Sequence, residues 1–390
     1  MNRRNFIRLS GGGLVLAAGP LAAGCSTAVP PEAVAAWQRP GNEADVRRWI
    51  LGYAILAPHS HNLQSWVLDL RVPGEILLRC DPGRLLPETD PFSRQIMMSH
   101  GTFLELLDLA ARERGHRAEI ELFPEGVFAF DSIDARPVAR IRLAPDAGVA
   151  RDPLFAQTLK RRTNRSVYEP GRAVPAAAWQ AMAEAVNPNP LRFGHVDATQ
   201  SALLQQHRDI AAEAWRIELV TPRTILESFK VLRVGATEVA QHRDGISLMD
   251  PKVVWLNRFG LFDRSQAPKP NDFATTSQIK DFGEKLASTS AFLWMVSEGN
   301  ERVTQVNAGR AYARVQLAAT AHGVVMHPLQ QALQEYPEQA GPYADIRRLL
   351  DAPQPAGTVP QTVQMWARVG HAPEVSPAPR RGVAAHLVGA

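Results

Sequence analysis

The chain has 390 residues, of which 45% are hydrophobic and 21% charged, a balance typical of a globular protein with two domains or one large unit. Its formal net charge of +4 includes Arg3, Arg4 and Arg8 of a predicted leader, and without these three the chain has 40 basic and 39 acidic residues. This near-neutral balance excludes the broad basic surface that nucleic-acid binding needs.

Residues 1–28 predict a targeting segment that is not part of the fold. The pair Arg3-Arg4 precedes a weakly apolar run interrupted by four glycines and a proline, which favours twin-arginine export over general secretion. Twin-arginine carriers move folded proteins, so a cofactor would be loaded before export. Residues 21–25 resemble a lipoprotein processing site that would lipidate Cys25, and plain cleavage nearby is the alternative. We therefore expect the periplasm or cell envelope, with membrane anchoring where Cys25 is lipidated.

The first part of the mature chain predicts a tether followed by alternating helices and strands. Residues 29–42 are rich in proline and alanine and predict a tether. The elements predicted next are a helix at 43–57, a hairpin at 66–70 and 75–80, a helix at 99–114, and strands at 118–123 and 138–143. Cys80 lies in the hairpin, where we expect a buried packing residue without a disulfide partner.

The second part begins after a junction rich in turn residues at 144–153. The elements predicted there are helices at 175–186, 198–220 and 308–321, with strands at 191–196 and 363–369. Residues 244–277 predict an irregular insertion, which would be either a lid over a ligand or a packed surface excursion. Its aromatic residues are Trp255, Phe259, Phe262 and Phe273. Helices dominate and short strands occur in both parts, which indicates an α+β fold.

Two helical segments share one sequence pattern. Residues 101–115 and 309–323 both read G-x7-L-A-A-x3-G, at an offset of 208 residues. A fixed offset predicts two related halves, here residues 43–150 and 151–390, although two alanine-rich helices can also look alike by chance. Related halves would form an intrachain pseudo-dimer, which could bind between them whatever a homodimer binds at its interface.

Three polar segments suit a phosphate or a polar heterocycle. The first is Arg161-Arg162-Thr163-Asn164-Arg165, whose guanidinium groups can grip a phosphate, with a solvated basic turn as the alternative. The second, residues 57–66, concentrates amide and hydroxyl groups between a predicted helix and a predicted strand. Its His59 and His61 are a weak candidate metal pair, because no third ligand stands at a telling spacing. The third is Arg380-Arg381, for which a disordered basic tail is the alternative.

These segments resemble the motifs of the nitroreductase-like FMN flavoproteins, and most closely their fused two-half branch, the Acg type. Residues 57–66 look like the family's A-P-S-S-x-N-x-Q-P-W, and residues 161–165 look like its R-R-S-x-R. The repeat helices look like the central helix of that fold. Arg380-Arg381 stands where the family keeps a phosphate-binding arginine near its end. The resemblance covers nearly everything after the leader and implies two fused nitroreductase-like halves.

The resemblance also implies one complete FMN site between the halves. In the homodimeric family, the arginine motif and terminal arginine come from one subunit and the polar segment from the other. Each set occurs once here, so the pseudo-symmetric site should be degenerate. The implied contacts are Arg161, Thr163 and Arg381 at the phosphate or ribityl chain, with Arg162 and Arg380 in support; Arg165 at the N1/O2 edge; His59, Ser60, Asn62 and Gln64 from the first half; and the backbone of His327, Pro328 and Leu329 near N5.

Three positions depart from the family's motifs. His59 stands in place of a serine, Ser65 in place of a proline, and Thr163 in place of a serine. The threonine keeps the hydroxyl group, whereas the bulkier His59 would narrow the pocket. These departures bear on the substrate range more than on flavin binding.

The resemblance implies an FMN-dependent oxidoreductase. It would pass a hydride, in ping-pong fashion, from a small-molecule donor to an electron-poor acceptor such as a nitroaromatic or a quinone, and flavin N5 rather than a side chain would carry the chemistry. An exported protein meets little NAD(P)H, so the alternative is an FMN-binding, sequestering envelope protein with little turnover. A third hypothesis is an envelope binding module without flavin. Because the interface is already internal, we expect a monomer.

Overall fold

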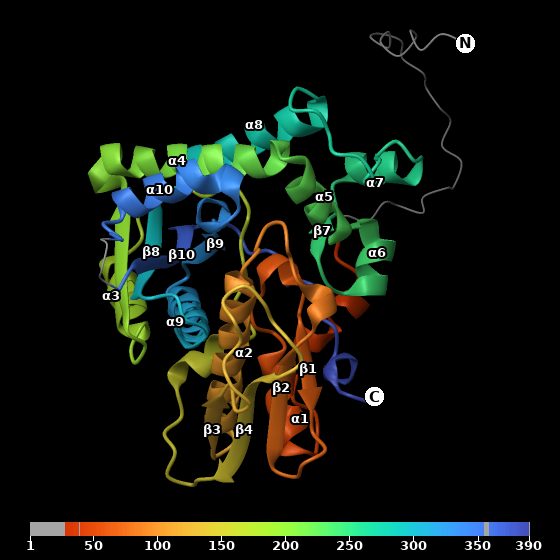
Figure 1. Ribbon diagram of the computed structural model, residues 1–390, viewed down its shortest axis with the longest axis vertical. Helices are drawn as coiled ribbons and strands as arrows, with labels where there is room; N and C mark the ends of the chain where they lie inside the picture. Colours follow the sequence, from red (N-terminus) through yellow and green to blue (C-terminus); the bar gives the residue numbers. More distant parts are fainter. Residues whose placement is uncertain (1–27, 39, 355–358, 390) are drawn as a thin grey trace.

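The computed structural model describes residues 28–38, 40–354 and 359–389, so most of the predicted leader, including Cys25, lies outside the described residues. Two four-stranded sheets lie on either side of a central pair of long helices, α2 and α9 (Figure 1). The strands of the first sheet are β1 Trp66–Asp69, β2 Glu75–Cys80, β3 His116–Leu122 and β4 Pro137–Pro145. Those of the second are β5 Leu191–Asp197, β8 Ala291–Glu298, β9 Val325–Pro328 and β10 Gln361–Gly370.

Both sheets have the same topology. The first follows the order β1-β2-β4-β3 and the second β5-β8-β10-β9, and all neighbouring strands are antiparallel. In each case a long helix separates the second strand from the third along the chain: α2 Arg94–Glu113 in the first half and α9 Arg302–Ala321 in the second. The chain order of strands and helix is therefore the same in both halves.

The repeated glycines are needed where these two helices cross and where they end. A Cβ on Gly101 would overlap the carbonyl oxygen of Val306, and one on Gly309 would overlap that of Met98. After each helix, the last glycine of the pattern has a left-handed φ, +65° at position 115 and +66° at position 323, as in a common type of helix cap. The shared spacing thus places a close helix contact and a cap at matching positions in the two halves.

The two hydrophobic cores interlock across the helix pair. Val306 and Leu317 of α9 lie in the core of the first half, and Met98 of α2 lies in the core of the second. The C-terminal segment also crosses to the first half, where the Val388 amide donates to the Leu68 carbonyl at 2.9 Å (Figure 1). The halves are therefore packed as one body.

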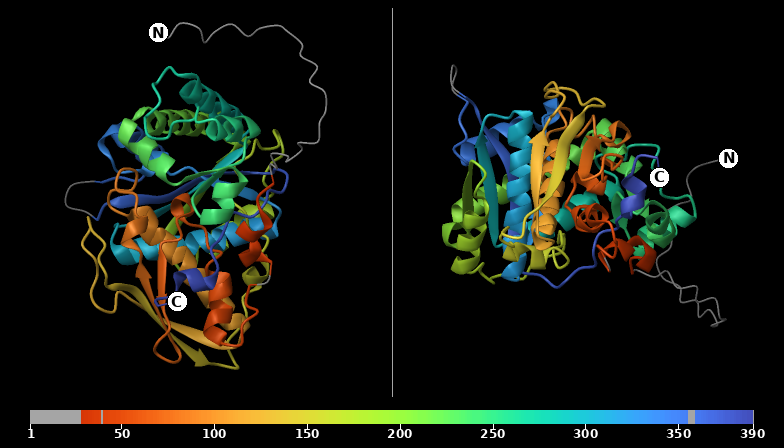
Figure 2. Two further views of the ribbon diagram at one scale, coloured as in Figure 1. Left: turned by 90° about the vertical axis from the view of Figure 1, so that its right-hand side faces the viewer. Right: turned by 90° about the horizontal axis from the view of Figure 1, so that it is seen from below.

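The remaining helices flank the sheets and fill an insertion between β5 and β8. They are α1 Val46–Ala54, α3 Ala176–Ala185, α4 Ser201–Val220, α5 Pro222–Lys230, α6 Gly235–His242, α7 Pro251–Arg258, α8 Phe273–Ala287 and α10 Ala340–Leu349. The insertion also carries the short parallel strands β6 Leu232–Val234 and β7 Ile246–Leu248. In the left view of Figure 2, α4 and α8 of the insertion lie above the second sheet. Within the described part of the chain, no helix combines the length and apolarity needed to cross a membrane.

Most predicted elements are confirmed, with shifted ends. The long helices α2 and α9 begin several residues before the predicted starts, at 94 and 302. Strand β8 was not predicted. Nearly all its side chains are buried, so its sequence lacks the alternation of apolar and polar residues that indicates a strand. Cys80 is a free, buried cysteine, and burial raises the pKa of its thiol to about 12.

Two expectations about irregular segments are wrong. Residues 244–277 contain β7, α7 and the start of α8. The predicted tether packs on the protein as two 3-10 helices, η1 Pro31–Ala33 and η2 Ala35–Trp37, in which Ala33 and Trp37 are buried. In both segments, prolines at the first helical positions start short helices and were read as breaks.

Candidate functional site

Two arginines from distant parts of the second half lie together at the seam between the halves. Arg161 lies in the loop before α3, and its Nη2 donates to the Leu56 carbonyl at 2.9 Å. Arg380 lies in the C-terminal segment, and its Nη2 donates to the Ala57 carbonyl at 2.9 Å while Nη1 donates to Asn62 Oδ1. Both carbonyls belong to the turn that follows α1 of the first half. The structure therefore brings the arginine motif against the polar segment of the first half.

These cations are buried without a negative partner. Arg161 and Arg380 are 2% and 3% exposed, and neither has a carboxylate at ion-pair distance among the described residues. The Nε atoms of Arg161, Arg162 and Arg380 are buried and lack a hydrogen-bond partner. Burial lowers the pKa of Arg161 to about 10, and burial together with repulsion from Arg161 lowers that of Arg380. Such a site favours an anion, which would offset the cost of burying positive charge.

The rest of the arginine motif is fixed to the second sheet. The Asn164 amide donates to the Met326 carbonyl at 3.0 Å, and Thr163 forms an isolated parallel bridge with Met326. Arg162 is half-buried, and its Nη1 donates to the carbonyls of Leu159 and Arg161 at 2.7 and 2.8 Å. The solvated-turn alternative therefore does not describe this segment, because its backbone is held and its first arginine is buried.

Arg165 faces residues of both halves. Its side chain is solvent-accessible and makes no hydrogen bond or ion pair with the described residues. The surrounding protein still removes enough water from the guanidinium group to lower the pKa of Arg165. Burial lowers the pKa of His61, in the first half, to about 4, with the positive charge of Arg165 as the second cause. Burial and Arg165 likewise lower the pKa of His327 on β9. Arg165 is thus a free cation between the polar segment and β9.

His59 is folded back onto its own segment. Its Nδ1 lies 2.8 Å from the Ser60 carbonyl, and its Nε2 lies 2.8 Å from Ser65 Oγ and 3.2 Å from the Ser65 amide. Burial holds its pKa well below the usual value, so the neutral ring donates from Nδ1 and accepts at Nε2. Both ring nitrogens of His59 are therefore engaged within the segment, and its contact with a ligand stays a prediction. The two departures at 59 and 65 are coupled: a proline at 65 would have no N–H to donate.

Asn62 and Gln64 hold other segments in place. Gln64 is fully buried; its Nε2 donates to the Arg243 carbonyl at 2.9 Å and its Oε1 accepts from the Arg381 amide at 3.0 Å. Asn62 Nδ2 donates to the carbonyls of Pro379 and Gly245 at 3.1 and 3.2 Å. These amides therefore fix the C-terminal segment and the insertion, and Gln64 is not free to contact a ligand.

Ser60 connects the polar segment to α2. Ser60 Oγ lies 3.1 Å from His61 Nδ1 and donates to Gln95 Oε1 at 3.4 Å, and the Ser60 amide donates to Ser99 Oγ at 3.0 Å. Positions 61, 62 and 64 all have positive φ, between 49° and 55°. The left-handed turn is what directs these side chains towards the C-terminal segment.

Arg381 lies on the side of the segment away from Arg161. Its Nη2 donates to the Gln64 carbonyl at 2.6 Å, and burial and the nearby charge of Arg84 lower its pKa to about 10. Of the two terminal arginines, Arg380 therefore lies beside Arg161, whereas Arg381 is bonded to Gln64.

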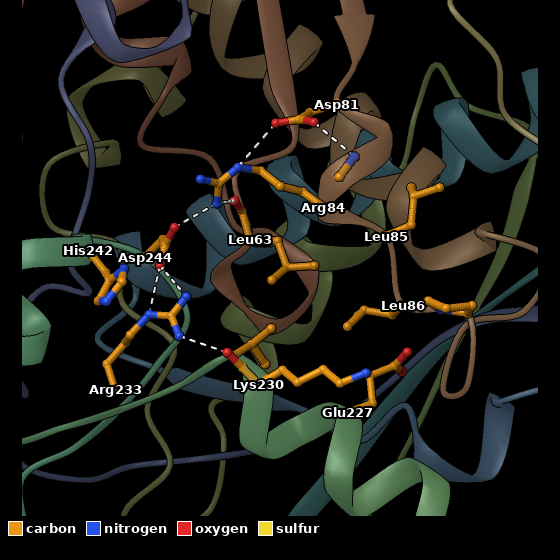
Figure 3. Close-up of a pocket in the computed structure, with 13 residues that line it drawn as sticks. Leu63, Asp81, Arg84, Leu85, Leu86, Glu227, Lys230, Arg233, His242 and Asp244 are labelled. Carbon is orange, nitrogen blue, oxygen red and sulfur yellow. Dashed lines mark hydrogen bonds and ion pairs between the residues drawn. The ribbon is translucent and has the colours of Figure 1, made fainter. Parts of the chain in front are cut away.

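Arg84 lines a cleft of about 520 Å³ between the first half and the insertion (Figure 3). There Asp244 pairs with Arg84 at 2.6 Å and with Arg233 at 2.9 Å. The two arginines are thus neutralised within the chain, unlike Arg161 and Arg380. This cleft has less need of an anionic ligand than the seam.

The predicted segment on β9 is only partly free. His327 Nδ1 accepts from Arg368 Nε at 3.0 Å, so the neutral ring carries its proton at Nε2. Pro328 pairs with Ala367 across the sheet, and the Leu329 amide donates to the Trp366 carbonyl at 2.8 Å. The Leu329 amide is therefore engaged within the sheet, and the position of this backbone near a ligand stays a prediction.

Sequence reasoning missed two cations and one aromatic residue near the seam. Arg368 and Lys285 both lower the pKa of His327 through their charge, and Trp37 lies against the buried arginines. No short motif contains these residues. Of the aromatic residues proposed for a lid, Trp255, Phe259 and Phe273 are 53%, 59% and 86% exposed, and Phe262 packs on Phe229.

Comparison with known proteins finds relatives over most of the chain. No family model matches. Two curated proteins of Mycobacterium tuberculosis, from strains H37Rv and CDC 1551 / Oshkosh, are each 27% identical over 350 residues, which cover 87% of this chain and 90% of theirs. Both carry the name "Putative NAD(P)H nitroreductase". The chain is thus similar to nitroreductase-like proteins along nearly its whole length.

Solved structures of nitroreductases are more distant. The FMN and NADPH-dependent nitroreductase NfnB from sphigopyxis sp. strain HMH is 18% identical, with 60% of this chain and 97% of that chain covered and a TM-score of 0.36. The FMN-dependent nitroreductase NfnB from Mycobacterium smegmatis, in complex with NADPH, is 17% identical, with 58% and 92% covered and a TM-score of 0.33.

Proposed function

We propose that this protein is an FMN-dependent oxidoreductase of the nitroreductase type. The observation that carries the proposal is the cluster of Arg161, Arg162 and Arg380 at the seam, whose Nε atoms are all unpartnered. Arg161 and Arg380 are buried without a carboxylate at ion-pair distance among the described residues, and Arg162 is half-buried beside them. A phosphate is the anion whose geometry guanidinium groups match best. The names of the two curated relatives support a nitroreductase-type reaction.

The two halves are proposed to be a fused pseudo-dimer with one complete site. The shared strand order and the symmetric contacts of Gly101 and Gly309 support the duplication. The arginine motif occurs only in the second half and the polar segment only in the first. One FMN per chain, and a monomeric protein, follow from this arrangement.

The residues at the seam would hold the cofactor as follows. Arg161, Arg162 and Arg380 would bind the phosphate, and Arg165 would supply a free positive charge to the electron-rich ring. When bound, FMN supplies hydride transfer between a donor such as NAD(P)H and an electron-poor acceptor such as a nitroaromatic or quinone. His61 and His327 have lowered pKa values, so both stay neutral at pH 7 and add no repulsion towards Arg165.

The test is reduction and reoxidation of the flavin-loaded protein without oxygen. NADH or NADPH should bleach the bound flavin, and a nitroaromatic compound should restore its colour. A protein that binds FMN but is reduced by neither donor would support the alternative, an FMN-sequestering protein with little turnover, which the deep burial of Arg161 and Arg380 favours. A protein that binds no FMN would contradict both.

The cellular location is part of the proposal. Arg3 and Arg4, with the weakly apolar run after them, support twin-arginine export to the periplasm or cell envelope. Anchoring through a lipidated Cys25 is the accompanying proposal. Replacing both arginines with lysine should leave the protein in the cytoplasm, which cell fractionation would show.

A further inference from the structure

The N-terminal segment before α1 covers the buried arginines. The Ala33 carbonyl accepts from the Arg380 amide at 2.8 Å, and Trp37 Nε1 donates to the Ala378 carbonyl at 2.8 Å. Trp37 is 7% exposed and ends η2. Residues 33–37 and the C-terminal segment are therefore joined directly at the arginine cluster.

The Trp37 ring lies against three guanidinium groups at once. Its centroid is 4.9 Å from the Cζ of Arg162, 5.6 Å from that of Arg161 and 5.7 Å from that of Arg380. All three distances are within the range of cation–π attraction, which is strongest for tryptophan. The three arginines come from two segments more than 200 residues apart in sequence. A single indole ring therefore contacts all three members of the cluster.

An indole ring shields these cations but does not neutralise them. It removes water from the guanidinium faces, and it has no negative charge and no strong acceptor for their N–H groups. The Nε atoms of all three arginines stay unpartnered beside it. A desolvated cation that keeps free donors attracts an anion more strongly than a hydrated one. A carboxylate at position 37 would have abolished this property, because it would pair with the arginines itself.

We infer that Trp37 closes the phosphate end of the site and makes it select FMN over riboflavin, which has no phosphate. This inference rests on the proposed function, because it needs the arginine cluster to bind the FMN phosphate. Trp37 is then a specificity-determining residue that acts through the arginines. Loss of its ring would let water reach the guanidinium groups, weaken the hold on the phosphate and speed FMN release.

The experiment compares two flavins on three variants of the full mature protein. Trp37→Leu removes the ring, and Trp37→Phe keeps a weaker aromatic face. Trp179→Leu is the matched control, because Trp179 is also 7% exposed and stacks on His195, with both residues in the second half. The readouts are Kd values for FMN and riboflavin, the FMN dissociation rate, and the thermal midpoint of the apo protein.

Trp37→Leu should raise the Kd for FMN about tenfold and leave that for riboflavin within about twofold, with Trp37→Phe between wild type and Leu. Trp179→Leu should leave the ratio of the two Kd values unchanged. If Trp37→Leu unfolds, the ratio in Trp37→Phe decides. Equal loss of both flavins, or no loss, would overturn the inference and leave the proposed function standing. A wild-type protein that binds no FMN would overturn both.

Discussion

Two groups of arginines lie on the seam between the halves, and they differ in what neutralises them. At the α2–α9 crossing, Glu105 is buried and accepts from Arg310 Nε at 2.8 Å and Arg314 Nη1 at 2.9 Å. At the other group, Arg161 and Arg380 are buried more deeply than these arginines and face only neutral oxygens. Since buried charge needs a partner, the first group is complete within the chain and the second calls for an anion from outside.

The largest expected effect is on the complete group. Glu105→Gln removes the carboxylate shared by two arginines and should lower the free energy of unfolding by about 3 kcal/mol. Urea denaturation measures this loss. FMN affinity should change little, because Glu105 is not part of the arginine cluster at the phosphate end. A stability equal to wild type would show that the ion pairs are not what compensates burial at the crossing.

Arg161→Met should have the opposite pattern. It removes charge-assisted hydrogen bonds to the phosphate worth about 1.5–3 kcal/mol, so the Kd for FMN should rise roughly 10- to 150-fold. The apo protein should lose little stability, because an unpaired buried charge is removed with it. Arg314→Met is the matched control, expected to lower stability and leave FMN affinity intact. Unchanged FMN affinity in Arg161→Met would refute the phosphate assignment.

The helix crossing gives a comparison between glycines. Gly101→Ala and Gly309→Ala should each cost about 1–3 kcal/mol, because their Cβ atoms would overlap backbone of the opposite helix. Gly283→Ala in α8 meets nothing within 4 Å and should be neutral or stabilising by up to about 1 kcal/mol. Thermal unfolding of the three variants measures the difference. Equal behaviour at all three positions would remove the packing explanation for the repeat.

The smallest expected effect concerns the free cation of the site. Arg165→Met should raise the pKa of His61 above its value of about 4 but not to 6.5, because burial is the larger cause of the shift. A lowered histidine pKa means that the unfolded chain binds the proton first, so stability falls as the pH drops from 6.5 to 4. In Arg165→Met this loss should be smaller.

An NMR titration, with the His61 signal assigned through His61→Gln, measures the change. Arg348→Met, which removes an exposed arginine paired with Asp345, is the control and should leave His61 unaffected. A His61 pKa that stays the same in Arg165→Met would show that the two residues do not lie close together in solution, which would contradict the arrangement at the seam.

Local patterns in the sequence predicted the repeat helices and the arginine motif. The spacing of Gly101 and Gly115 encodes a close contact and a cap, both of which depend on short-range geometry. The sequence could not tell which of Arg380 and Arg381 lies beside Arg161, because adjacent residues in extended backbone point to opposite sides. Trp37 could not be predicted as part of the site, because it lies in a segment whose composition resembles a linker. Only its tertiary contacts with three arginines show that it belongs there.

The polar segment shows the same limit. The side chains of His59, Asn62 and Gln64 are polar enough to bind a ligand. In the structure they form hydrogen bonds with Ser65, the C-terminal segment and the insertion, which no local pattern predicts. Their partners lie up to 318 residues away, so composition alone could not separate a ligand-binding role from a structural one.

The central claim is that the unneutralised arginines at the seam bind the phosphate of one flavin. Equilibrium titration of the apo protein with FMN, followed by absorbance and fluorescence, tests it directly. The account predicts saturation at one FMN per chain and competition by inorganic phosphate at high concentration. A protein that takes up no FMN, or two per chain, would contradict it.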